Sequence, residues 1–243
     1  MCTLVHGGRL ALTVSRVVCM FEGVAEIDKN EVRSVPGSGV GPWPGAEENW
    51  PQGDQYDPVL LREGDTRNVE DRFRYWSNEA IKGFLDSVGR PDWLEVAVQN
   101  LGHDFNIGSI VRTANCLGVR RVHIVGRRRW NRRGAMVTDR YLEVVHHREI
   151  DEFLDHVGSR GLHVIGIDNI EGSRPLEGRE LPDKCVLVMG EESTGLSEDM
   201  ARACESVLHI TQYGSSRSMN VGHAAAIAMW AWVIQHGSDP EGA

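Results

Sequence analysis

Three short segments combine glycines with polar side chains in a way that could hold a small ligand. The first spans residues 106–114 and places Arg112 in an otherwise apolar stretch. The second spans residues 189–197 and has a glycine on each side of an acidic turn. The third spans residues 210–220 and ends in Ser-Met-Asn, just before a long apolar segment. Backbone amides at such turns can receive a polar ligand, and a guanidinium group can bind a phosphate.

Each segment also has an ordinary structural interpretation. Arg112 could pair with a structural carboxylate or lay its aliphatic part along apolar surface. The second segment could be a tight turn before a helix capped by Ser197, and it is not a P-loop because no lysine follows Gly195. Asn220 could simply cap the last helix. A single segment therefore does not distinguish a ligand site from local structure.

The elements around these segments alternate between strand and helix. Strands are expected over residues 94–98, 122–125, 162–167, 186–189 and 207–210, and helices over 107–117, 150–157, 197–204 and 220–236. Asn106 is the expected N-cap of the first of these helices. This order predicts an α/β domain with a mainly parallel sheet flanked by helices. All three segments then lie at the carboxyl ends of strands, where open α/β sheets bind ligands.

Taken in order, the segments resemble the three motifs of the SPOUT superfamily of RNA methyltransferases, in its SpoU/TrmH-like ribose 2′-O branch. The motifs read N-x-G-x-x-x-R-x-A, G-x-E-x-x-G-L and S-L/M-N, and the resemblance covers about residues 92–238. The matching residues are Asn106, Gly108, Arg112 and Ala114, then Gly190, Glu192, Gly195 and Leu196, then Ser218, Met219 and Asn220. Two departures occur: Thr211 stands where the family commonly has a proline, and Gly222 follows Val221 where a serine is typical.

The resemblance implies a C-terminal trefoil knot, a homodimer and S-adenosylmethionine as methyl donor. It assigns catalytic roles to Arg112, Asn106, Glu192, Ser218 and Asn220, and donor contacts to Met189, Gly190, Gly195, Ile210, Ser218 and Met219. A guanidinium is a poor base because its pKa exceeds about 12, so Arg112 is expected to position the phosphate and hydroxyl electrostatically. No metal is implied. One face of the last helix, with Val221, Ala225, Ala228 and Trp232, suits either a dimer interface or an intrachain core.

Arginines are dense between the first and second motif-bearing segments. Eight lie between positions 120 and 140, namely Arg120, Arg121, Arg127, Arg128, Arg129, Arg132, Arg133 and Arg140. A charged run of this kind is often only a solvated face. With the resemblance, RNA contacts are expected from Arg127, Arg128, Arg129, Trp130, Arg132 and Arg133, because arginine binds phosphates and an aromatic ring can stack on a base.

Composition narrows the class of protein. The net charge of −9 argues against indiscriminate coating of nucleic acid. The five cysteines form no CxxC pair and the ten histidines show no ligand spacing, so neither a disulfide framework nor a metal site is expected, and a reducing cytoplasm fits. His146 and His147 are interpreted as a solvated loop pair. No apolar run reaches membrane-spanning length, and residues 10–20 are only a weak signal-peptide candidate.

Three regions are expected along the chain. Residues 1–67 are rich in glycine and proline and are predicted to be poorly structured. Residues 68–92 form a helical extension, a second candidate for RNA contact or a support for the dimer, and residues 93–238 form the methyltransferase domain.

The favoured substrate is tRNA, since the basic run followed by Gly134, Ala135 and Tyr141 resembles small tRNA-modifying members. The alternatives are a ribosomal RNA methyltransferase, possibly of the resistance type, and a non-catalytic RNA-binding scaffold. An oxidoreductase is disfavoured because no strand-linked glycine fingerprint occurs.

Overall fold

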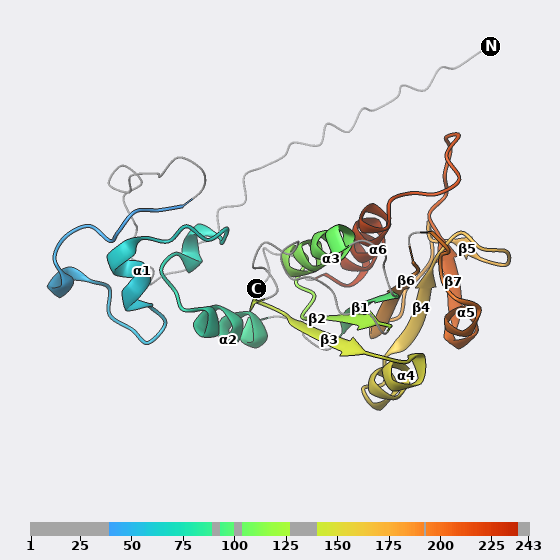
Figure 1. Cartoon of the computed structure of the whole chain (residues 1–243), viewed down its shortest axis with the longest axis horizontal. Coiled ribbons are helices and arrows are strands. Elements are labelled where there is room, and N and C mark those ends of the chain that lie inside the picture. The colour runs from blue at the N-terminus through green and yellow to red at the C-terminus, as the bar shows by residue number, and fades with distance from the viewer. Residues whose placement is uncertain (1–38, 89–92, 100–103, 127–139, 192, 238–243) are drawn as a thin grey trace, which may run out of the picture.

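The computed structural model describes residues 39–88, 93–99, 104–126, 140–191 and 193–237. Its centre is a seven-stranded sheet in the order β3-β2-β1-β6-β4-β7-β5, and every paired neighbour is parallel. The strands are β1 (Leu94–Gln99), β2 (Arg121–Val125), β3 (Glu143–His147), β4 (His163–Ile167), β5 (Arg174–Pro175), β6 (Cys185–Met189) and β7 (Ser206–His209). The expected parallel α/β sheet is confirmed (Figure 1). The knot implied by the resemblance stays a prediction.

Helices cover both faces of the sheet (Figure 1). The helices of this domain are α3 (Asp104–Cys116), α4 (Ile150–Ser159), α5 (Glu198–Ala203) and α6 (Val221–His236). α3 and α6 pack on one face, and α4 and α5 pack on the other. Successive side chains of a strand point to opposite faces, so β1 sends Val96 and Val98 toward α3 and α6, and Ala97 toward α4 and α5.

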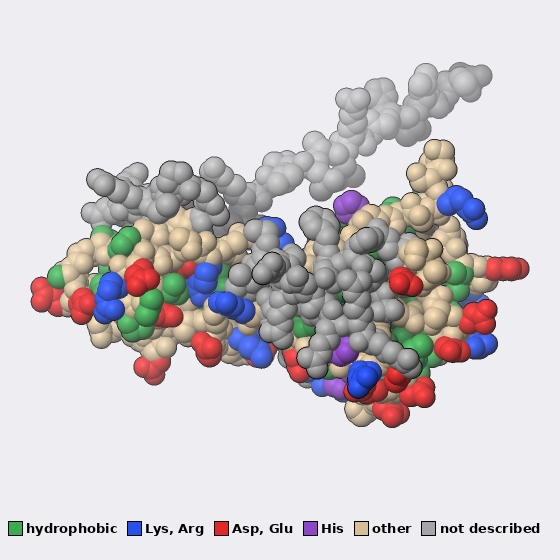
Figure 2. Space-filling view, in the orientation of Figure 1, with side chains coloured by type: hydrophobic (Ala, Val, Ile, Leu, Met, Phe, Trp, Pro, Cys, Tyr) green, Lys and Arg blue, Asp and Glu red, His purple; other side chains and the backbone are tan. Residues whose placement is uncertain are grey.

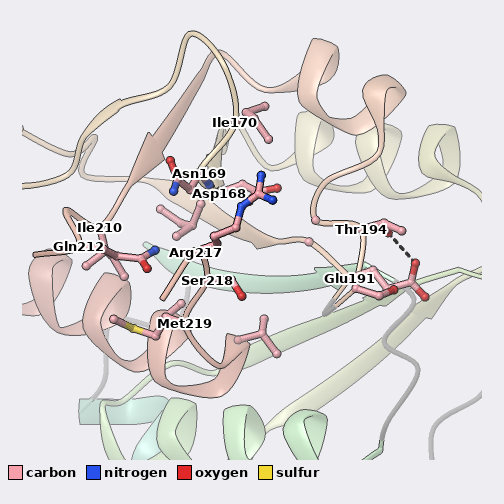
Figure 3. A pocket seen from close by; sticks show the side chains of 16 residues that line it. Asp168, Asn169, Ile170, Glu191, Thr194, Ile210, Gln212, Arg217, Ser218 and Met219 are labelled. Atoms are coloured by element: carbon pink, nitrogen blue, oxygen red, sulfur yellow. Dashed lines mark hydrogen bonds between the residues drawn. The ribbon is translucent and has the colours of Figure 1, made fainter. Parts of the chain in front are cut away.

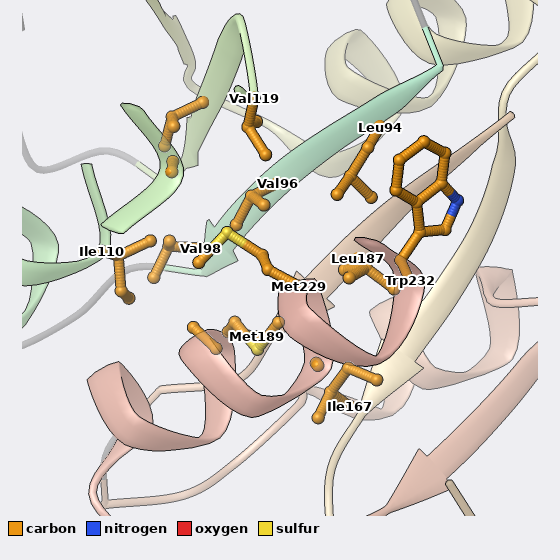
Figure 4. Packing of buried hydrophobic residues seen from close by; sticks show 14 of the residues in the cluster. Leu94, Val96, Val98, Ile110, Val119, Ile167, Leu187, Met189, Met229 and Trp232 are labelled. Carbon is orange, nitrogen blue, oxygen red and sulfur yellow. The ribbon is translucent and has the colours of Figure 1, made fainter. Parts of the chain in front are cut away.

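The last helix is held by the core of its own chain. Ala225, Ala228 and Trp232 are buried against the sheet, which resolves the two interpretations of this face in favour of an intrachain core. Figure 4 shows Met229 and Trp232 beside Leu187 of β6. Burying side chains of this size contributes roughly 1.5–3 kcal/mol each.

Residues 39–88 form a separate small unit, which corrects for residues 39–67 the expectation that residues 1–67 are poorly structured; residues 1–38 lie outside the described residues. The unit contains η1 (Glu47–Asn49), α1 (Pro58–Glu63), η2 (Asp71–Phe73) and α2 (Asn78–Val88). Its centre is the fully buried carboxylate of Asp65, which accepts hydrogen bonds from the Tyr75 amide (3.0 Å) and from Arg67 Nε (2.8 Å). Composition missed this fold because its anchor is a buried ion pair rather than a run of apolar residues.

The small unit is attached to the sheet domain through the residues just before β2 and β3. Arg120 Nε donates to Asp86 of α2 (2.8 Å), and its Nη1 donates to the Tyr141 carbonyl (2.6 Å). Tyr141 packs with Phe73 and Ile81 of the unit. Arg120, which was counted in the basic run but not among the expected RNA contacts, is therefore a structural residue.

The unit is acidic, with ten carboxylate residues against five basic ones in residues 39–88. Figure 2 shows acidic side chains at its outer edge. Phosphate backbones repel such a surface, so its charge does not favour the RNA contact considered for residues 69–87. Among the described residues, no helix is both long and apolar enough to cross a membrane.

β3 is the strand that the sequence pattern missed. His146 and His147 belong to it, and His147 is only 2% exposed, so the interpretation of these two as a solvated loop pair is wrong. The strand has only two aliphatic residues, Val144 and Val145, and its polar end hid it from a search for apolar runs. It pairs with β2 and is the edge strand next to α4.

Candidate cofactor and RNA site

A pocket of about 390 Å³ opens at the carboxyl ends of β4, β6 and β7, beside the start of α6 (Figure 3). Residues from four loop segments line it: 168–170, 190–191 with 193–195, 210 with 212, and 217–219. The second and third sequence motifs therefore meet at one cavity. Its size lies in the range of ordinary small-molecule sites, which is about 300–1,000 Å³.

The turn after β6 closes on itself through its backbone. The Glu191 amide donates to the Gly195 carbonyl (2.9 Å), and the Gly195 amide donates back to the Glu191 carbonyl (2.8 Å). Gly195 has φ +72°, a conformation that favours glycine. A Cβ at Gly190 would lie 2.2 Å from the Gly195 carbonyl carbon. Gly190 is thus required by close backbone approach, and Gly195 by its backbone conformation.

Asp168 holds this turn against β4, and sequence reasoning missed it. Its Oδ2 accepts a hydrogen bond from the Leu196 amide (2.7 Å), and its Oδ1 accepts one from the Asn169 amide (2.7 Å). A Cβ at Gly195 would lie 2.3 Å from the same Oδ2. The available signal was position: Asp168 follows an expected strand of a parallel sheet, at the edge where ligands bind.

The first and third motifs are joined by their asparagines. Asn220 caps α6, because its Oδ1 accepts from the Gly222 amide (2.9 Å), and its Nδ2 donates to Asn106 Oδ1 (3.0 Å). Asn106 is buried and is the third residue of α3, so its expected role as N-cap is wrong. The helix begins earlier, at Asp104, and this turns the Asn106 side chain toward α6 rather than along its own helix.

Most of the residues expected to contact the methyl donor line this pocket. Gly190, Gly195, Ile210, Ser218 and Met219 all line the pocket. Met189 does not: it ends β6 inside the core and is 1% exposed. Eleven further lining residues were not selected as donor contacts by sequence reasoning: Ile167, Asp168, Asn169, Ile170, Glu191, Ser193, Thr194, Gln212, Arg217, Val221 and Ala224.

The described residues expected to contact RNA are not gathered at the pocket. Arg112 is exposed on α3, the helix that packs against α6, and it is not among the pocket-lining residues. Glu192 and the RNA-binding candidates at 127–133 (Arg127, Arg128, Arg129, Trp130, Arg132 and Arg133) lie outside the described residues. Arg121 pairs with Glu95 and Glu143 and is a structural residue like Arg120.

The departure at Thr211 has a structural reason. The Thr211 amide donates to Glu177 Oε1 (2.9 Å), and its hydroxyl donates to Glu177 Oε2 (3.0 Å). Hydrogen bonds from its own backbone amide and from Thr211 hold the pKa of the Glu177 carboxyl below its usual value. A proline at this position could not donate the amide hydrogen bond. Thr211 and Glu177 therefore fix the loop after β7 by another means.

Comparison with known proteins identifies the family of this chain. The profile of the SpoU rRNA Methylase family matches residues 94–230, more than half of the chain. The chain belongs to this family. The SpoU profile begins at β1 and ends inside α6, so the small unit of residues 39–88 lies outside it.

Individual relatives agree with this membership. An uncharacterized tRNA/rRNA methyltransferase of Mycobacterium avium is 32% identical over 59% of this chain and 48% of its own length. The tRNA (guanosine(18)-2′-O)-methyltransferase of Escherichia coli K12 is 24% identical over 58% of this chain and 62% of its own. The chain thus spans about half to three fifths of the length of these curated SpoU relatives.

A solved SpoU structure shows the same fold. The SpoU methyltransferase AviRb of Streptomyces viridochromogenes, in complex with the cofactor AdoMet, is 26% identical, with a TM-score of 0.56. The match covers 61% of this chain and 60% of that protein.

Proposed function

We propose that this chain transfers a methyl group from S-adenosylmethionine to a ribose 2′-hydroxyl of RNA, with tRNA as the favoured substrate. The observation that carries the proposal is the meeting of the second and third SpoU motifs at one pocket, with Asn106 of the first motif bonded to Asn220 of the third. A family member whose site had decayed would have no reason to keep this arrangement, which disfavours the scaffold alternative.

The residues of the pocket fit the proposed donor. Gly190 and Gly195 leave backbone surface where any side chain would collide, and Ile210 and Met219 supply apolar lining. When bound, S-adenosylmethionine supplies a methyl group already activated on a sulfonium. The chain's own task is then to hold the donor and bring the hydroxyl to it, which positioning alone can accelerate strongly. Asp168 serves this task by holding the turn after β6.

Arg112 is proposed to act on the RNA side. Its guanidinium can bind a phosphate and orient the neighbouring ribose, and its charge stabilises the oxygen as the hydroxyl gives its proton to solvent. It lies on α3, whose Asn106 is bonded to the cap of α6 beside the pocket. The Asn106–Asn220 hydrogen bond thus connects the helix bearing Arg112 to the loop bearing Ser218. Ser218, Asn220 and Glu192 are proposed to orient the ribose.

The choice of tRNA is supported by the Escherichia coli relative, a tRNA (guanosine(18)-2′-O)-methyltransferase. Ribosomal RNA is the second candidate, favoured by the description of the family as rRNA methylases. We also propose a homodimer through the outer face of α6, where Ile227, Trp230 and Ile234 are 40%, 55% and 64% exposed. Sedimentation equilibrium of the chain measures this directly.

The experiment is methyl transfer from labelled S-adenosylmethionine to unmodified tRNA and, separately, to ribosomal RNA, followed by nucleoside analysis. A 2′-O-methylnucleoside in one pool supports the proposal and names the substrate. A base-methylated nucleoside, or donor binding without transfer to either pool, contradicts it.

Arg112→Ala tests the division of roles. We expect transfer to fall by about 100-fold or more while the affinity for the donor changes little, because the arginine acts on the RNA. Arg202→Ala is the control, since Arg202 is an exposed arginine on α5. An equal loss of donor affinity and turnover in Arg112→Ala would overturn the assignment to the RNA side.

A further inference from the structure

A group of one carboxylate and three imidazole side chains lies under α4, on the sheet face opposite α3 and α6. It consists of Glu95 on β1, His123 on β2, His147 on β3 and His156 on α4, here called the histidine cluster. Glu95 and His123 are 0% exposed, and His147 is 2% exposed. None of the four lines the pocket, so the cluster is separate from the proposed methyl-transfer site.

The two oxygens of Glu95 have different partners. Oε1 accepts from Arg121 Nη1 (2.5 Å) and from Arg160 Nε (3.0 Å). Among the described residues, the hydrogen-bond partner of Oε2 is the ring of His123, with its Nε2 at 2.6 Å. Both guanidiniums are thus balanced by one oxygen, while the other is directed into the cluster.

His156 brings a nitrogen that the described residues leave without a partner. Its Nε2 is buried and has no hydrogen bond within the described part of the chain. The centre of its ring lies 5.3 Å from that of His123 and 5.2 Å from that of His147. A buried polar atom left unsatisfied costs about 1–3 kcal/mol, so something should meet this nitrogen in the native protein.

We propose that the histidine cluster binds a divalent transition-metal ion of the zinc class, with Glu95, His123 and His156 as ligands. One ligand atom from each lies within 4.8 Å of the other two. Two imidazoles and one carboxylate suit zinc, cobalt or nickel, whereas magnesium and calcium prefer oxygen ligands alone. The unpartnered Nε2 of His156 is the observation that points to a ligand.

Binding requires a small opening of the cluster. An ion bound at about 2.0–2.1 Å by each ligand holds neighbouring ligand atoms about 3.4 Å apart. The Glu95–His123 contact of 2.6 Å must therefore widen, and the proton between these two atoms must leave. Oε1 of Glu95 can keep both arginines through this change, because they do not share the oxygen that binds the ion.

His147 contacts the nitrogen of His123 that faces away from Glu95. Its Nε2 lies 2.9 Å from His123 Nδ1 and can accept the Nδ1–H proton when the other nitrogen of His123 binds metal. Metal-bound histidines commonly donate their second ring proton in this way, which fixes the ring and its tautomer. Arg121 and Arg160 oppose a cation, so we expect weaker binding than at a zinc finger.

The test uses the untagged full chain, freed of metal with EDTA and then titrated with Zn²⁺ and, separately, with Co²⁺. We expect one ion per chain after gel filtration, and a visible absorption band from Co²⁺ in a site of low coordination number. X-ray absorption of the zinc form should show two imidazoles among the ligands.

The decisive variant is His156→Asn, which we expect to retain its fold and lose the stoichiometric ion. His163→Asn is the matched control, because His163 also faces a carboxylate (Nδ1 to Glu205 Oε2, 2.8 Å) but is exposed on β4. Wild-type protein that binds no ion above the buffer level overturns the proposal, and so does equal loss of the ion in both variants. Neither outcome bears on methyl transfer, since the cluster and the pocket share no residue.

Discussion

The pocket and the histidine cluster occupy one sheet but are built by opposite means. The pocket depends on backbone shape at Gly190 and Gly195, where side chains are excluded. The cluster is made of side chains, with a carboxylate and imidazoles buried beneath α4 and two guanidiniums beside them. A site that depends on backbone shape should be broken by one added methyl group. A site that depends on charge balance should tolerate a methyl group nearby but not the loss of one charge.

The largest effect is expected at the pocket. Gly190→Ala places a Cβ 2.2 Å from both the Gly195 carbonyl carbon and the Leu196 amide nitrogen, so the turn after β6 must move. We expect methyl transfer to fall by about 100-fold or more, together with donor binding, because misplacement of a binding loop by about 1 Å is enough for such a loss. Transfer assays and calorimetric titration with S-adenosylmethionine measure the two effects.

The control for this variant is Gly158→Ala on α4. No atom lies within 4 Å of a Cβ at Gly158, and its backbone is helical. We expect unchanged transfer and a small gain in stability, because alanine in a helix is favoured over glycine by roughly 0.5–1 kcal/mol. Full activity in Gly190→Ala would show that the turn is not part of the donor site.

The second effect is expected at the cluster. Burial alone would raise the pKa of Glu95, but the hydrogen bond from His123 and the charges of His123 and Arg121 bring it below its usual value. Glu95→Gln leaves Arg121 and Arg160 without their shared buried counter-charge. Breaking a buried pair in this way costs about 3–5 kcal/mol of unfolding free energy, measured by urea denaturation.

Glu143→Gln provides the contrast, because the Glu143 side chain is 50% exposed although it also pairs with Arg121. An exposed pair of this kind contributes about 1 kcal/mol or less. Similar losses of unfolding free energy in the two variants would mean that burial of the Glu95 charge does not determine its contribution to stability.

The same contrast explains what could be predicted from the sequence. The pocket segments are local: Gly190 and Gly195 lie on one turn, and Ser218, Met219 and Asn220 are consecutive, so a motif shows them together. Asp168 was missed because it holds the turn through a hydrogen bond from the Leu196 amide, a long-range contact that no spacing reveals. The parallel sheet followed from strand and helix alternation, since each of its longer apolar strands leaves a clear pattern.

The cluster could not be found in this way. Glu95, His123 and His156 come from β1, β2 and α4, and only the pairing of β1 with β2 and the packing of α4 bring them together. The small unit of residues 39–88 was missed for a related reason. Its buried Asp65 is recognised only through partners on other segments, such as the Tyr75 amide. Long-range polar contacts leave no periodicity in a sequence.

The third effect is a pH dependence of the unfolding free energy, which we expect from the histidine cluster. Burial, together with the neighbouring His123 and His156, lowers the pKa of His147 from 6.5 to about 4. The unfolded chain therefore binds this proton below pH 6.5, whereas the folded chain binds it only near pH 4. The stability contributed by neutral His147 is fully present above pH 6.5 and is lost as the pH falls toward 4, by about 3 kcal/mol at most.

Urea denaturation at pH 7 and at pH 4.5, with EDTA present so that no metal contributes, measures this loss. His147→Asn removes the titrating ring but keeps an amide that can donate to His123 Nδ1, so its stability should change less between the two pH values than that of the wild type. His163→Asn, which removes an exposed histidine, should keep the wild-type difference. If His147→Asn and wild type lose the same stability on acidification, His147 is not the group responsible, and the acid sensitivity of the fold comes from another group, such as His123, whose pKa burial also lowers.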